Sequence, residues 1–180
     1  MTGVALRHLY ALLIGLALMC SGAAVVAAEP QPDAKVAAAK KQMDQLAEAA
    51  FREAVKVVAE SGGFYPFALV MDAQERVRVV GYSGPAAEKP APEEYVKTLF
   101  WQVRHTVEEN VGLVSAVVVK PHFVTTDKGQ KVPGIWAAAD HRVSEAWVMF
   151  LPFVPQPDGT FTLGEIVYAP GQEPIFPLAE

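Results

Sequence analysis

The feature that most constrains this chain is an uncharged N-terminal run that follows Arg7 and covers residues 9–28. Its most apolar part, residues 9–20, has the length of a signal peptide's hydrophobic region and is too short for a helix across a bilayer. Val26 and Ala28 fit the −3 and −1 positions of a signal peptidase site. The sequence therefore predicts a cleaved signal peptide over residues 1–28 and a periplasmic or secreted protein.

Two other readings of this segment stay open. All of residues 9–28 could form an uncleaved membrane anchor, although the second half is mostly Ala and Val, which favours cleavage. Lipid could instead be attached at Cys20, although Met19 stands where a small residue normally precedes a lipidated cysteine. Either alternative would tether the folded part of the chain to a membrane.

The remainder has the size and charge of one soluble domain. Removal of residues 1–28 from a chain of 180 leaves 152 residues, enough for a single core. Without Arg7, 14 of the 15 basic residues remain against 20 acidic ones, a formal charge of −6 that opposes binding to nucleic acid. The only cysteine is Cys20, so the mature domain has no disulfide, which fits a bacterial envelope protein. We expect a short leader at 29–32 and one domain at 33–180.

Two stretches have helical periodicity. Residues 33–61 begin at Asp33, a suitable N-cap, and end at Gly62 and Gly63. Their apolar residues recur every three or four positions and predict one buried stripe: Met43, Leu46, Ala47, Ala50, Phe51, Ala54, Val55 and Val58. A second helix is predicted from Pro92 to about Asn110, with a shorter stripe made by Val96, Leu99, Phe100, Val103 and Val107.

Six segments have the composition of β-strands, namely 64–71, 76–82, 113–123, 132–139, 143–153 and 161–168. The first is apolar on both faces, as expected for a central strand between two layers. Turn residues separate most of these segments, so antiparallel pairing is expected. The sequence predicts an α+β fold in the order α-β-β-α-β-β-β-β, with one antiparallel sheet of five or six strands and both helices on one face.

Three short strings resemble a family of exported bacterial α+β proteins for which no activity is established. They are Gly62-Gly63-Phe64-Tyr65-Pro66-Phe67, then Asp140-His141-Arg142, then Phe150-Leu151-Pro152-Phe153. The resemblance covers most of the chain beyond residue 28. It implies the same order of helices and strands, and it implies no function.

The densest polar group in the apolar C-terminal half is Asp140, His141 and Arg142, followed by Glu145. If the strands around it form a hairpin, these side chains gather at the tip. Asp140 could then orient His141, and Arg142 could hold a carboxylate. The alternative is a solvated turn with a local ion pair.

A second candidate lies on the predicted helix 92–110. Trp101 and His105 project from the side opposite the apolar stripe. An indole on a polar helix face is either covered by a neighbouring segment or belongs to a partner-binding patch, because tryptophan is enriched at interaction hot spots.

No nucleophile, phosphate-binding or zinc-ligand motif is present, so the sequence predicts no catalytic residue, no metal and no cofactor. The leading hypothesis is an exported noncatalytic binding or interaction protein of the bacterial periplasm. Its partner would be an envelope protein or a small apolar ligand. The protein would be associated with a membrane only if the signal peptide is not cleaved. One alternative is a small-ligand sensor or carrier with a pocket between the sheet and a helix. Another is a small hydrolase that uses Asp140, His141 and Glu145.

Overall fold

The computed structural model describes residues 32–158 and 160–177, and it confirms the α+β fold and the predicted order of helices and strands. The predicted signal peptide and the start of the leader lie outside the described residues. The elements are α1 (Pro32–Ser61), β1 (Phe67–Asp72), β2 (Val77–Val80), the short 3-10 helix η1 (Ala86–Glu88), α2 (Pro92–Glu109), β3 (Leu113–Thr125), β4 (Lys131–His141), β5 (Ser144–Pro155), β6 (Phe161–Leu163) and β7 (Val167–Pro170).

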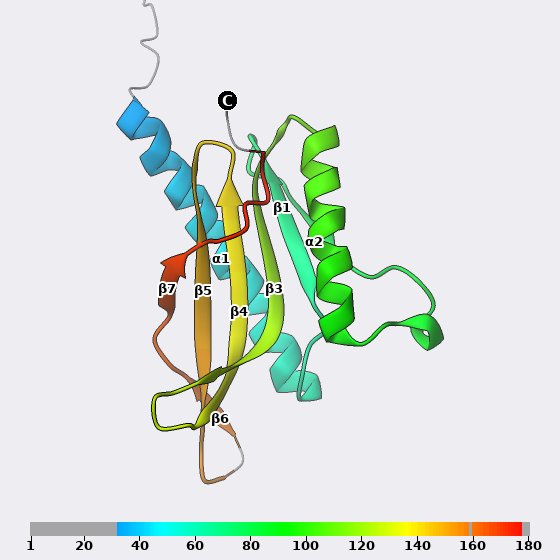
Figure 1. Ribbon diagram of the computed structural model, residues 1–180, viewed down its shortest axis with the longest axis vertical. Coiled ribbons are helices and arrows are strands. Elements are labelled where there is room, and N and C mark those ends of the chain that lie inside the picture. Colours follow the sequence, from blue (N-terminus) through cyan, green and yellow to red (C-terminus); the bar gives the residue numbers. More distant parts are fainter. Residues whose placement is uncertain (1–31, 159, 178–180) are drawn as a thin grey trace, which may run out of the picture.

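The strands form one antiparallel sheet in the order β2-β1-β3-β4-β5-β6, with β7 also paired to β5 (Figure 1). The long β3-β4-β5 meander forms its centre. Within the described part of the chain, no helix is long and apolar enough to cross a membrane.

The two helices lie on opposite faces of the sheet, with α1 behind it and α2 in front in Figure 1. The expectation that both helices share one face was therefore wrong. The reason lies in the alternation of side chains along the inner strands. In β1, Leu69 and Met71 pack in the cluster beneath α1, whereas Ala68 and Val70 pack in the cluster beneath α2. Such strands are apolar on both faces and need a helix on each.

The segment 161–168, which was predicted as one strand, forms two strands, β6 and β7. β6 pairs with residues 153–155 of β5, and β7 pairs with residues 147–150 of the same edge. Between them, the Gly164 N–H donates to the carbonyl of Pro152 at 2.9 Å, but proline has no N–H to return a bond. The missing donor explains why pairing along this edge of β5 is interrupted.

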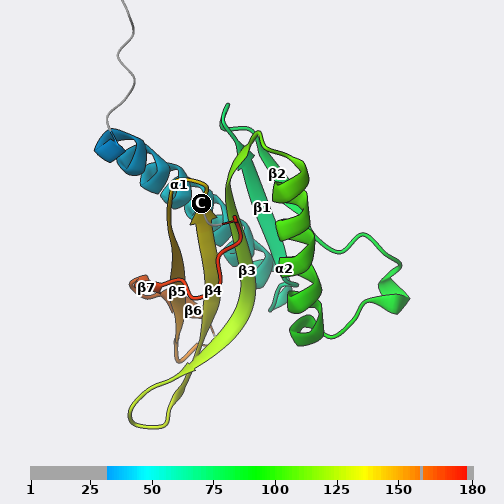
Figure 2. The ribbon, with the colours of Figure 1, turned by 45° about the horizontal axis from the view of Figure 1, so that its top comes forward.

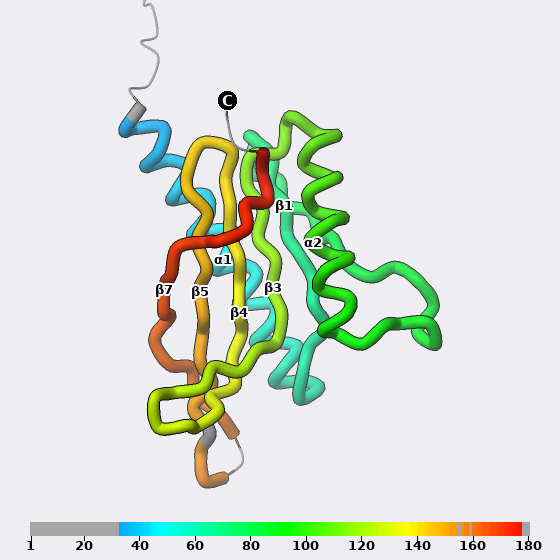
Figure 3. Tube along the Cα trace, in the orientation of Figure 1, coloured from blue at the N-terminus to red at the C-terminus, as the bar shows by residue number. Residues whose placement is uncertain are grey.

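The two helices cover unequal areas of the sheet. α1 packs on β1, β3, β4 and β5, whereas α2 packs mainly on β1, β2 and β3. The face of β4 and β5 that α2 leaves open is crossed by the C-terminal segment, residues 170–176, which runs back over the sheet from β7 (Figures 2 and 3). A space therefore remains between α2, this C-terminal segment and the sheet.

Candidate functional site

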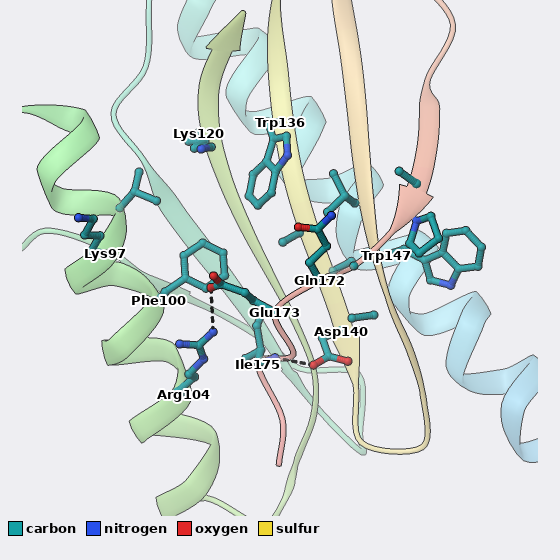
Figure 4. Close-up of a pocket in the computed structure, with 18 residues that line it drawn as sticks. Lys97, Phe100, Arg104, Lys120, Trp136, Asp140, Trp147, Gln172, Glu173 and Ile175 are labelled. Carbon is teal, nitrogen blue, oxygen red and sulfur yellow. Dashed lines mark hydrogen bonds and ion pairs between the residues drawn. The ribbon is translucent and has the colours of Figure 1, made fainter. Parts of the chain in front are cut away.

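This space is a cleft of about 580 Å³ (Figure 4). Its floor is the α2-side face of β3, β4 and β5, one wall is α2, and the other wall is the C-terminal segment. The size is that of a typical small-molecule site. It is lined by Val96, Lys97, Phe100, Arg104, Lys120, Trp136, Ala138, Ala139, Asp140, Ala146, Trp147, Val148, Ala169, Pro170, Gly171, Gln172, Glu173 and Ile175.

The floor is hollow because a small residue stands in the middle of it. Ala138 of β4 pairs with Val118 on one side and Val148 on the other, so these three side chains form one row on the same face. Two positions before Ala138 on the same face, the indole of Trp136 stands up from the sheet and meets the ring of Phe100, with centroids 6.2 Å apart. The depression at Ala138 is thus roofed at one end by aromatic rings.

The α2 wall is made by residues spaced one helical turn apart. Val96, Phe100 and Arg104 occupy positions i, i+4 and i+8 and line the cleft together. Val96 and Phe100 were predicted in the buried stripe of this helix, but both are half-buried. Their exposed parts face the cleft instead of a closed core.

The C-terminal wall is held by Asp140, whose side chain is only 3% exposed. Its Oδ2 accepts the backbone N–H groups of Ile175 at 2.6 Å and Phe176 at 2.9 Å, and its Oδ1 accepts the N–H of His141 at 2.7 Å. Burial raises the pKa of Asp140, and these three N–H donors offset part of that rise. Asp140 therefore anchors the C-terminal segment to the sheet.

Two further contacts fix the same wall. The Gly171 N–H donates to the Ala146 carbonyl at 2.8 Å, and a Cβ at position 171 would lie 2.7 Å from the Ala146 Cβ, so only glycine allows this approach. Arg104 reaches across from α2, donating to the Pro174 carbonyl at 3.2 Å and to the Glu173 carboxylate at 3.3 Å. The segment is thus tied to β4, β5 and α2.

Arg142 also has a structural position. Its guanidinium donates to the carbonyls of Val107, Asn110 and Leu113, at and just beyond the C-terminal end of α2. A cation is favourable there because the unpaired carbonyls of a helix end carry partial negative charge. The same guanidinium lies 4.9 Å from the centroid of the Phe176 ring. The predicted role of Arg142 as a carboxylate ligand does not match these contacts.

The ring of His141 points to the other face of the sheet from Asp140. Its Nε2 lies 3.0 Å from Gln42 Oε1 on α1, and its Nδ1 accepts the Val143 N–H at 3.2 Å. The Asp140 carboxylate bonds the backbone of His141 and does not orient its ring. Glu145 is exposed on the hairpin and lines a second hollow of about 510 Å³ together with Asp140, His141 and Arg142. The three residues proposed for hydrolysis therefore border one concave site, but the Asp140 carboxylate is engaged by backbone N–H groups and the His141 ring by Gln42 and Val143. Within the described part of the chain, no hydrogen bond joins any two of these three side chains.

These contacts of His141 require a neutral imidazole with its proton on Nε2. Burial lowers the pKa of His141, and the nearby Arg142 charge lowers it further. In the unfolded chain His141 has its ordinary pKa near 6.5, which is higher than its pKa in the folded protein. The contribution of His141 to stability is therefore complete above pH 6.5 and decreases as the pH falls below it.

We expect the free energy of unfolding to fall less steeply between pH 7.5 and 5 in His141→Asn than in the wild type. Urea titrations across this range test this, and equal slopes would contradict it.

Trp101 and His105 lie on the outer face of α2, away from the cleft. Trp101 is 63% exposed, and its ring stacks on that of His105 with centroids 5.3 Å apart. His105 Nε2 lies 3.2 Å from a carboxylate oxygen of Glu109. Among the residues that the structure describes, no neighbouring segment buries the indole, so the partner-binding patch stays a prediction.

Sequence reasoning missed Lys120 and Trp136, which the structure places together on the cleft floor. The Lys120 Nζ lies 4.7 Å from the Trp136 ring centroid. A signal for Lys120 was present, because it is the one charge within the predicted strand 113–123. Trp136 gave no such signal, since an aromatic residue in a strand is ordinarily part of the core.

Among residues 32–158 and 160–177, no group of three or more His, Cys, Asp or Glu side chains could hold a metal ion. No protein-family model, no curated protein and no solved structure matches the chain. The cleft is therefore interpreted from its own geometry.

Proposed function

We propose that the protein is an exported, noncatalytic binding protein and that the cleft between α2, the sheet and the C-terminal segment is its ligand site. Of the sequence hypotheses, the geometry supports most directly the small-ligand sensor or carrier, with a pocket between the sheet and a helix. The observation that carries the proposal is the cleft of about 580 Å³ with aromatic, apolar and charged lining.

The construction of the cleft supports this role. Its C-terminal wall is held by buried hydrogen bonds to Asp140 and by the Arg104–Glu173 ion pair, so the space is bounded on both sides before a ligand arrives. A preformed site loses less conformational entropy on binding than one that must be ordered. The exported location is part of the proposal, and it is supported by the signal-peptide pattern of residues 1–28.

Filling the floor of the cleft should abolish binding. The Ala138→Leu substitution adds three carbon atoms to the depression between Trp136 and Val148. We expect small organic molecules that shift the Trp136 indole N–H signal of the wild type in NMR spectra to lose at least about tenfold in affinity for this variant.

Ala73→Leu is the matched control, because it adds the same side chain to an exposed turn between β1 and β2. It should bind as the wild type does. The proposal fails if no molecule in a broad panel of small anions, cations and neutral compounds shifts cleft signals, or if those that do bind Ala138→Leu equally well.

A further inference from the structure

We infer that the ligand of this cleft is a small organic anion, a carboxylate attached to a compact apolar body. This inference rests on the proposed function and specifies the chemistry of its ligand. It follows from which charged groups of the lining are already paired and which are not.

Both acidic residues of the cleft are engaged with the protein itself. Asp140 accepts three backbone N–H groups, and Glu173 is paired with Arg104 at 3.3 Å. Asp140 is buried with both oxygens occupied, and the charge of the largely exposed Glu173 is partly balanced by Arg104. The described lining therefore offers a cationic ligand no unpaired carboxylate.

The free charges of the cleft are positive. Of the three basic residues in the lining, Arg104 is held by Glu173 and by the Pro174 carbonyl. Within the described part of the chain, neither Lys97 nor Lys120 has a carboxylate within 4.0 Å. Lys120 is half-buried, with its Nζ 4.7 Å from the Trp136 ring centroid, so its charge is less screened than that of an exposed lysine. This ammonium offers hydrogen-bond donors and no acceptor.

The remainder of the floor is apolar and small. Ala138, Ala146 and Val148 line the space below the rings of Trp136 and Phe100. These rings already touch, with centroids 6.2 Å apart, so a ligand lies beneath them and is not inserted between them. A compact apolar body fits over Ala138 while its anionic group reaches Lys120. The lining's single arginine is already paired, and bidentate recognition of phosphate normally needs a free one.

Benzoate, benzamide and benzamidine test this inference, because they have nearly the same shape and carry a negative charge, no charge and a positive charge. Each is titrated into ¹⁵N-labelled protein while the Trp136 indole N–H is followed, assigned by comparison with Trp136→Phe. We expect benzoate to bind at least about tenfold more tightly than benzamide, because charged hydrogen bonds contribute more than neutral ones. Benzamidine should bind most weakly.

Lysine variants identify the charge that is responsible. Lys120→Met keeps the length of the aliphatic chain and should reduce benzoate affinity about tenfold while leaving benzamide affinity within about twofold. Lys97 stands on the exposed rim, so Lys97→Met should have an effect of about twofold. Lys128→Met removes the same charge from the exposed turn between β3 and β4 and should change neither affinity.

Three results would overturn the inference, and each is distinguishable from failure of the proposed function. If benzamide or benzamidine binds as tightly as benzoate and Ala138→Leu abolishes that binding, the cleft is a ligand site but not one for anions. If benzoate binds and the Lys120→Met and Lys128→Met substitutions weaken benzoate binding equally, the binding reflects the net charge of the protein. The inference that Lys120 holds the anion in the cleft is then wrong. Failure of all three compounds to shift the Trp136 signal also overturns the anion assignment, and the broader panel with Ala138→Leu then decides the proposed function separately.

Discussion

Replacement of Asp140 by alanine should lower the free energy of unfolding by about 3–5 kcal/mol. The substitution leaves three buried backbone N–H groups without their acceptor, at His141, Ile175 and Phe176. The last two hold the C-terminal segment against the sheet. We therefore expect a lower urea midpoint, faster hydrogen exchange at Ile175 and Phe176, and loss of ligand binding in the cleft.

The Asp140→Asn variant separates the lost charge from the lost acceptor. One amide oxygen can still accept the Ile175 and Phe176 N–H groups, but the NH₂ group then faces the N–H of His141, so we expect about half the loss. Asp127→Ala removes a carboxylate from an exposed turn and should leave stability nearly unchanged. If Asp140→Ala unfolds at the wild-type urea concentration and Ile175 exchange is unchanged, Asp140 is not the anchor.

The order of the elements could be predicted because it depends on local patterns. The stripe from Met43 to Ala54 has helical spacing and lies buried under α1, as expected. The placement of the two helices could not be read from such spacing, since a stripe shows that a helix is covered and not which face of the sheet covers it. The informative signal was the strand 64–71, whose apolar residues on both faces indicated two layers.

The candidate site was harder to predict because its contacts join distant parts of the chain. The sequence marked Asp140 and Arg142 as polar residues in an apolar region. However, the backbone groups that Asp140 binds at the C-terminus lie 35 and 36 residues later in the chain, and the carbonyls that Arg142 binds lie 29, 32 and 35 residues earlier. No local pattern encodes such pairing. The same limitation applies to the cleft, whose walls are α2 and a C-terminal segment that the sequence indicated only as a proline-rich tail.

Truncation of the central leucine of either helix should also be strongly destabilising. Leu46 of α1 and Leu99 of α2 are both fully buried, one in each of the two clusters. Leu46→Ala and Leu99→Ala should each lower the free energy of unfolding by about 2–5 kcal/mol, because each removes apolar contacts and leaves a cavity. Urea denaturation measures both losses. A loss below about 1 kcal/mol at either position would mean that the leucine is not part of a close-packed core.

The same two positions test whether the helices lie on opposite faces. The milder variants Leu46→Val and Leu99→Val keep the double variant folded, and each should lose about 1 kcal/mol. Since the whole sheet separates the two clusters, their effects should add to within about 0.5 kcal/mol in a double-mutant cycle. As a positive control, Leu99→Val should couple to Val103→Ala, because both residues belong to the cluster beneath α2. Coupling between Leu46 and Leu99 as strong as in that control would place both helices over one shared core and contradict the three-layer arrangement on which the cleft depends.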